Sequence, residues 1–183
     1  SNVVGVRSSG LLAMRQGLAQ LGDVVVGAPG RNWSAGSHSR TLWAPLRVTP
    51  TSLADGSEAM ACDGTPADCV ALAVLGLLPK RPDLIVSGIN LGPNLGHDVL
   101  YSGTVAAAME SLIMGIPSIA VSLVDGYKPD ANMRAAAFWT RQIAARACAE
   151  QLPADVLLNV NVPAGPPESI AGAKVTKLGH RVY

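Results

Sequence analysis

The sequence predicts an α/β fold in which helices cover both faces of a mostly parallel sheet. Segments with helical periodicity alternate along the 183 residues with runs of β-branched side chains, which is typical of right-handed strand–helix–strand crossovers. Hydrophobic residues make up 49% of the chain and aromatic residues only 4%, so aliphatic side chains must fill the core, as in parallel sheets. The formal net charge of +1 excludes a disordered tail and argues against a nucleic-acid binder with a basic face.

The first third of the chain predicts a helix, a buried strand and an inserted hairpin. Apolar residues recur at helical spacing over 11–21, and a glycine follows as a C-terminal stop. The β-branched run at 23–28 ends at a proline, as expected of a strand that is buried on both faces. The segment 30–64 is polar and interrupted by glycine and proline, and its strand-like pieces at 41–48 and 58–62 predict the hairpin.

The rest of the chain continues the alternation. Thr65, Pro66 and Asp68 supply an N-cap, a first-turn proline and an early acidic residue, which together predict a helix start. The elements expected after residue 64 are helices at 65–78, 103–114 and 130–151, strands at 82–88, 117–123, 156–162 and 174–177, and an irregular loop at 88–102. We therefore expect residues 1–183 to form a single three-layer, Rossmann-like domain.

Ligands of such folds bind at the carboxyl ends of the strands, so the loops that follow strands are candidate sites. One of these loops contains Ser87, Asn90, Asn94 and three glycines within ten residues. Asparagine oxygens are hard neutral ligands for Mg²⁺ or Mn²⁺, and glycine lets the backbone approach an anion closely. A turn-rich connection, in which asparagine only tolerates left-handed backbone, explains the same residues equally well.

Ser102, Gly103 and Thr104 open the helix that follows this loop. The free N–H groups of a helix start, together with two hydroxyls, form a ready phosphate site. A plain N-cap at Ser102 is the alternative explanation, because serine is favoured at that position.

The polar loop at 29–39 supplies Arg31, Ser34 and His38 after the first predicted strand. His38 is a candidate general acid or base, although a lone histidine in a polar loop is more often solvated. Ser34 is not part of a G-x-S-x-G elbow, which argues against a serine hydrolase. Asp68 is explained as a helix-start residue, and the other two histidines lack metal-ligand spacing.

Three cysteines without a C-x-x-C pair fit neither a disulfide framework nor a zinc knuckle, and they indicate a reducing compartment. No stretch reaches the ~18 to 20 uninterrupted apolar residues that a membrane span needs. The first residues also lack a signal-peptide pattern. We therefore expect a cytoplasmic protein without membrane contact.

Several sequence blocks follow one another at fixed spacing. In chain order they are APxRNxS from residue 28, GTPADCV from 64, SGINxGPNxG from 87, YSGTVAAAME from 101, GIPSIAVS from 115, LNVNVP from 158 and VTKxG from 175. Over essentially the whole chain, these blocks resemble the SurE (survival protein E) family of nucleotidases.

The resemblance implies a divalent-metal-dependent phosphatase that removes phosphate from nucleoside 5′- and 3′-monophosphates in the cytoplasm, as a homodimer or homotetramer. In that family one Mg²⁺ or Mn²⁺ ion per subunit is held by two adjacent aspartates, a serine and an asparagine. Ser34 and Asn90 correspond to the last two ligands, and Asn90 and Ser102 are the expected catalytic positions. The positions that correspond to the family's phosphate pocket are Asn94, Ser102, Gly103 and Thr104.

The chain departs from the family where the two metal-binding aspartates are expected, because Val3 and Val4 stand there. Valine has no lone pair to donate, and hard cations depend on charged oxygen ligands. The residues as written therefore predict weak metal binding and strongly reduced phosphatase activity. Trp33 also stands where the family commonly has arginine or another polar residue. By the same resemblance, we expect 1–183 to lack the family's first strand, which lies in the middle of the sheet, and its C-terminal extension.

Three functions remain open on the sequence alone. The first is a metal-dependent nucleotidase. The second is a non-catalytic binder of phosphate or nucleotide on the same fold, which Val3 and Val4 favour. The third is an oligomeric interaction module in which the Asn-rich loop serves only the architecture. Metal-dependent turnover, metal-independent binding and absence of nucleotide binding would distinguish the three.

Overall fold

The computed structural model describes residues 1–128, 132–153 and 155–180 of the chain. Its helices are α1 (Ser9–Leu18), α2 (Pro66–Leu72), α3 (Asp98–Tyr101), α4 (Gly103–Ile113) and α5 (Arg134–Glu150), with a π-helical segment η1 (Ala73–Leu77) and a 3₁₀ turn η2 (Pro167–Ser169). Its strands are β1 (Gly27–Pro29), β2 (Val48–Ser52), β3 (Glu58–Cys62), β4 (Ile85–Leu91), β5 (Ser118–Leu123) and β6 (Leu157–Val162).

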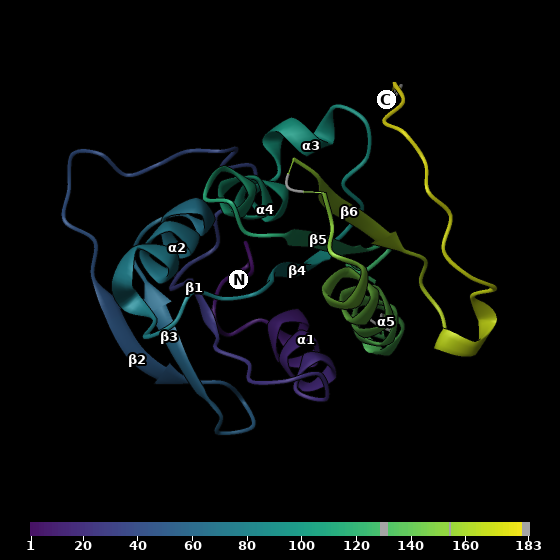
Figure 1. Cartoon of the computed structure of the whole chain (residues 1–183), viewed down its shortest axis with the longest axis horizontal. Coiled ribbons are helices and arrows are strands. Elements are labelled where there is room, and N and C mark those ends of the chain that lie inside the picture. The colour runs from purple at the N-terminus through teal and green to yellow at the C-terminus, as the bar shows by residue number, and fades with distance from the viewer. Residues whose placement is uncertain (129–131, 154, 181–183) are drawn as a thin grey trace.

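The elements are arranged in layers that confirm the predicted three-layer α/β class (Figure 1). Strands β4, β5 and β6 pair in parallel, in that order, with α1 and α5 on one face and α3 and α4 on the other. A second sheet has the order β1-β3-β2 and contains the predicted hairpin, because β2 and β3 are antiparallel and β1 runs parallel to β3. The carboxyl end of β4 leads into the loop before α3.

Two predicted strands begin later than expected. The strand predicted at 23–28 forms only from Gly27 onward, because the residues before it line a cavity on one side. The first hairpin strand is predicted at 41–48, but it begins only at Val48, the last residue of that range. The backbone N–H groups of Thr41 and Arg47 donate to aspartate side chains, at 3.1 Å and 2.8 Å, in place of a neighbouring strand.

Other predictions need correction as well. The helix predicted at 65–78 loosens after its first two turns, where Gly76 has a φ of +136° that an L residue rarely adopts. The loop predicted at 88–102 includes the end of β4 and the short helix α3. The segment 174–177 is exposed and forms no strand within the described residues. Positions 130–131 of the last predicted helix lie outside the described residues.

The core has three parts. Ile89, Ile119, Val121 and Leu123 of the parallel sheet are buried against α5, a second cluster lies between α1 and β1, and a third joins α3 and α4 to β5. A cavity of about 590 Å³ with a largely aliphatic lining separates β1 from β4. That 1–183 form a single domain without the family's first strand and C-terminal extension stays a prediction.

Ser1 lies inside the fold, at the end of this cavity. Its main-chain nitrogen donates to the carbonyl oxygen of Val86 at 2.9 Å, and its own carbonyl oxygen accepts from the N–H of Gly88 at 2.7 Å. These bonds place Asn2 beside the carboxyl end of β4, where its side-chain amide reaches the carbonyl oxygen of Ile89.

Candidate functional site

Segments that are far apart in the sequence meet at the carboxyl end of β4. The side-chain amide of Asn2 donates to the carbonyl oxygen of Ile89 at 3.0 Å, and the N–H of Trp33 donates to the carbonyl oxygen of Val3 at 2.9 Å. A Cβ placed on Gly103 would lie 2.8 Å from Val3 Cγ2 and 3.5 Å from the carbonyl oxygen of Trp33. The start of α4 therefore touches both the chain start and the polar loop after β1.

The start of α4 is the most polar part of this meeting point. The Ser102 hydroxyl accepts from the N–H of Val105 at 3.2 Å, so the N-cap predicted at this position is present. The N–H groups of Gly103 and Thr104 precede the first intrahelical hydrogen bonds and have no helical partner. Thr104 is fully buried, and within the described part of the chain its hydroxyl has no hydrogen-bond partner.

A buried hydroxyl without a partner costs roughly 1 to 3 kcal/mol, so the Thr104 hydroxyl is an unsatisfied donor at the start of α4. The N–H groups of the first turn and the positive end of the helix dipole lie at the same place, which is the combination that favours an anion. The N-cap at Ser102 is compatible with such a site, and the site itself stays a prediction.

Asn94 is held at the ends of β5 and β6. Its side-chain amide donates to the hydroxyl of Ser122 at 2.7 Å, and its main-chain N–H donates to Asn161 at 2.8 Å. Its carbonyl oxygen accepts from the amides of Asn159 and Asn161. The bond to Ser122 uses one of the two hydrogens of the Asn94 amide. A role of Asn94 in phosphate binding stays a prediction.

The predicted metal ligands are neutral and engaged with their own loops. Ser34 is exposed, and its hydroxyl donates to the side-chain oxygen of Asn32 at 2.7 Å. The side-chain amide of Asn90 donates to the carbonyl oxygen of Gly92 at 2.9 Å. Val3 is only 3% exposed, and no cluster of three histidine, cysteine, aspartate or glutamate side chains occurs in the described residues. This donor set does not fit Mg²⁺ or Mn²⁺, which need charged oxygens.

Sequence reasoning missed a group of titratable side chains between the loop after β1 and the helices α2 and α4, in which two carboxylates are buried and the basic partners are partly exposed. Arg40 lies between two carboxylates, with its guanidinium 2.5 Å from Glu110 and 3.3 Å from Asp68. His38 Nε2 lies 2.8 Å from the second oxygen of Glu110. The only hint in the sequence is Glu110 itself, an acidic residue within an otherwise small and apolar helix. We call these four side chains the charge cluster.

Asp68 has two roles in this cluster. It forms the predicted capping box with Thr65, whose N–H it accepts at 2.9 Å, and it also accepts from the hydroxyl of Thr41 at 2.7 Å. Burial alone would raise the pKa of Asp68, but the hydrogen bonds from Thr41 and Thr65 outweigh it and lower that pKa below its ordinary value. The carboxylate is therefore ionised at neutral pH.

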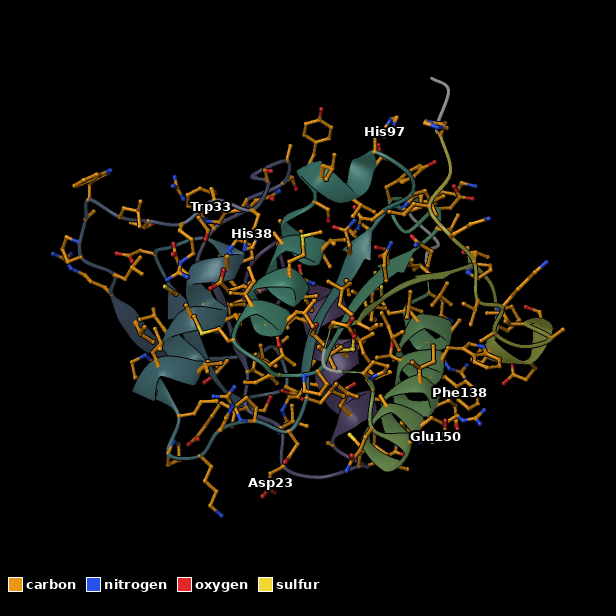
Figure 2. The ribbon with its side chains drawn as sticks, turned by 45° about the horizontal axis from the view of Figure 1, so that its top comes forward. Asp23, Trp33, His38, His97, Phe138 and Glu150 are labelled. Carbon is orange, nitrogen blue, oxygen red and sulfur yellow. The ribbon has the colours of Figure 1, made fainter. Side chains whose placement is uncertain are left out.

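The charge cluster fixes the loop after β1 to the helices α2 and α4. Ser37 adds contacts with α3, because its N–H and hydroxyl donate to the carbonyl oxygens of Tyr101 and Leu100 at 3.1 Å and 2.7 Å. In Figure 2, Trp33 and His38 lie on the same side of the molecule, away from Phe138 on α5. His38 is hydrogen-bonded to Glu110, which lies two turns of α4 away from the helix start, and a role of His38 as a general acid or base stays a prediction.

These features define a class of protein: a Rossmann-like α/β domain in which a helix start with unpaired donors lies beside the carboxyl ends of parallel strands. Residues 1–183 match the family model described as Survival protein SurE, and the chain belongs to that family.

Individual relatives agree with the family assignment. The 5′-nucleotidase SurE of Herpetosiphon aurantiacus is 69% identical over 183 residues, which are 100% of this chain and 72% of the relative. That of Chloroflexus aggregans is 53% identical with the same coverage. The crystal structure of the SurE protein from Aquifex aeolicus superposes with a TM-score of 0.90 at 44% identity, over 100% of this chain and 72% of that one.

These comparisons confirm the family and the fold expected from the sequence. The enzyme class expected from the sequence, a phosphomonoester hydrolase, is the class that the name of the relatives denotes.

Replacing Arg40 by alanine should destabilise the protein, because it leaves two buried carboxylates without their shared cation. We expect the free energy of unfolding to fall by about 3 kcal/mol in urea denaturation at pH 7. The loss should shrink below about pH 4, near the ordinary pKa of aspartate, as protonation of Asp68 through its lowered pKa removes the charge that Arg40 offsets. Arg47→Ala, at an exposed arginine of the same segment, is the control. Equal losses in both variants would contradict this account of the charge cluster.

Proposed function

We propose that this protein acts on the phosphate group of nucleoside 5′- and 3′-monophosphates, as a phosphomonoester hydrolase. The observation that carries the proposal is the start of α4, where the buried Thr104 hydroxyl lacks a partner in the described residues beside two unpaired N–H groups. The name 5′-nucleotidase, which the similar relatives bear, supports hydrolysis of a nucleotide as the reaction.

The proposed role of each site residue follows from the hydrogen-bond donors that it carries. The N–H groups of Gly103 and Thr104 and the Thr104 hydroxyl donate to the non-bridging oxygens of the phosphate. The Ser102 oxygen accepts from Val105, so its own hydrogen is available for a phosphate oxygen. Asn90 adds a side-chain amide from the end of β4, and Asn94 adds one beside the ends of β5 and β6. Such fixed donors stabilise the charge that develops on the phosphoryl oxygens in the transition state.

The residues of this chain can be compared with those that hold the family's divalent cation. By the family resemblance, two aspartates hold the cation together with a serine and an asparagine, which correspond to Ser34 and Asn90. When bound, such an ion polarises the phosphoryl group and activates a water. With Val3 and Val4 at the aspartate positions, the residues present do not fit the ion. The proposal for this chain therefore rests on its neutral donors, and we expect its rate of hydrolysis to be strongly reduced.

A non-catalytic binder of phosphate or nucleotide is the second candidate function, and the buried side chain of Val3 favours it. An apolar group in contact with the start of α4 occupies the place where the family's reaction needs a charged ligand. We further propose, from the family resemblance, that the protein is a cytoplasmic homodimer or homotetramer. Within the described ranges, no helix has the length and apolar character to cross a membrane.

Thr104→Val tests the anion site. Valine has the shape of threonine and removes the unpaired hydroxyl, so binding of inorganic phosphate and of AMP should weaken about tenfold while the free energy of unfolding stays equal or rises. Calorimetric titration and urea denaturation measure the two quantities. Thr140→Val is the control, at a buried threonine whose hydroxyl is already bonded within α5. Unchanged phosphate affinity in Thr104→Val would refute the proposed site.

The double substitution Val3→Asp with Val4→Asp tests the cause of the reduced rate. It should raise Mn²⁺-dependent hydrolysis of AMP by about a hundredfold or more, because a bound cation stabilises the transition state by several kcal/mol. The matched control, Val3→Asn with Val4→Asn, adds polar groups without charge and should gain little. Circular dichroism confirms that each variant is folded. Robust Mn²⁺-dependent turnover by the unmodified chain would contradict the expectation.

A further inference from the structure

Trp33 lies at the rim of the proposed phosphate site. Its N–H bonds to Val3 at 2.9 Å, and its carbonyl oxygen would lie 3.5 Å from a Cβ on Gly103, the first residue of α4. The backbone of Trp33 therefore adjoins the helix start at which the phosphate is proposed to bind. A nucleotide whose phosphate occupies that place has its base within reach of the loop that carries the indole.

The indole of Trp33 is stacked with a guanidinium group. The Cζ atom of Arg31 lies 4.3 Å from the centroid of the Trp33 ring. Trp33 is half-buried and Arg31 is exposed, so part of this stacked cationic pair is accessible from solvent. Planar guanidinium groups and aromatic rings are the side chains on which nucleobases stack.

Two further observations indicate that this pair is preorganised for a ligand. The Trp33 Nε1–H is buried and, like the Thr104 hydroxyl, finds no hydrogen-bond partner in the described residues. The loop itself is held by the charge cluster and by Ser37, which fixes it to α2, α3 and α4. A fixed platform loses little conformational freedom when a ligand binds.

We propose that Arg31 and Trp33 form the nucleobase subsite of this protein, with the base stacked on the Arg31–Trp33 pair while the phosphate lies at the start of α4. The inference rests on the proposed function and adds to it a reason why a nucleoside monophosphate, rather than any phosphomonoester, is the preferred ligand. Purines, which offer the larger stacking area, bind more tightly than pyrimidines. Trp33 is a specificity-determining residue and takes no part in the chemical step.

Trp33→Ala tests this subsite through three ligands measured by calorimetry: AMP, ribose 5-phosphate and inorganic phosphate. AMP binding should weaken about tenfold, since stacking of one base carries about that factor. The affinities for ribose 5-phosphate and phosphate should change by less than about twofold. Trp33→Phe should retain part of the AMP affinity, and it keeps the test possible if the alanine variant does not fold. Trp43→Ala is the matched control, because Trp43 belongs to the same segment and is 96% exposed.

Each outcome decides the proposal. A loss of affinity in Trp33→Ala that is confined to AMP supports the subsite. A tenfold loss of AMP affinity in Arg31→Ala supports it further. Equal losses for all three ligands would overturn it, because Trp33 would then act only through the shape of the phosphate site. Equal affinity of the unmodified chain for AMP and ribose 5-phosphate would overturn the subsite while leaving the proposed function intact. Failure of all three ligands to bind any variant would overturn both.

Discussion

The geometry of the site depends on one ion-pair arrangement, in which Arg40 lies between the buried carboxylates of Asp68 and Glu110. Either carboxylate without a cation would be costly at that depth, and the shared guanidinium offsets both charges at once. The three residues come from α2, α4 and the loop after β1, so their pairing ties the loop to two helices. The position of that loop then determines where Ser34, Trp33 and Arg31 lie relative to the start of α4.

The proposed phosphate site differs from the charge cluster in that it relies on neutral hydrogen-bond donors rather than on ion pairs. At the start of α4 the donors are neutral: two N–H groups, the Thr104 hydroxyl and the helix dipole. The family adds a divalent cation and two aspartates to such a site, whereas here Val3 packs against Gly103 with an apolar side chain. In the function that we propose, this site holds a phosphate group but is poorly supplied with the charge that hydrolysis needs.

Much of the fold was predictable because its causes are local. The β-branched runs of β4, β5 and β6 and the caps at Thr65 and Ser102 determine their elements from neighbouring residues alone. The failures arise from tertiary contacts: β1 shortens beside a cavity, and the 41–47 backbone bonds to aspartates. The charge cluster joins residues about 70 positions apart, for which sequence spacing gives no signal. Ser34 and Asn90 were predicted as metal ligands only through the family resemblance. The lack of a partner for the Thr104 hydroxyl is visible only in the three-dimensional structure.

The central claim is that this chain holds a nucleotide phosphate with its own neutral donors, without a divalent cation. Calorimetric titration of AMP into the unmodified chain, once with EDTA and once with excess Mn²⁺, tests it most directly. The account predicts saturable one-site binding in both buffers, with dissociation constants within about threefold of each other, a difference below about 0.7 kcal/mol. Binding that appears only with Mn²⁺ would contradict it.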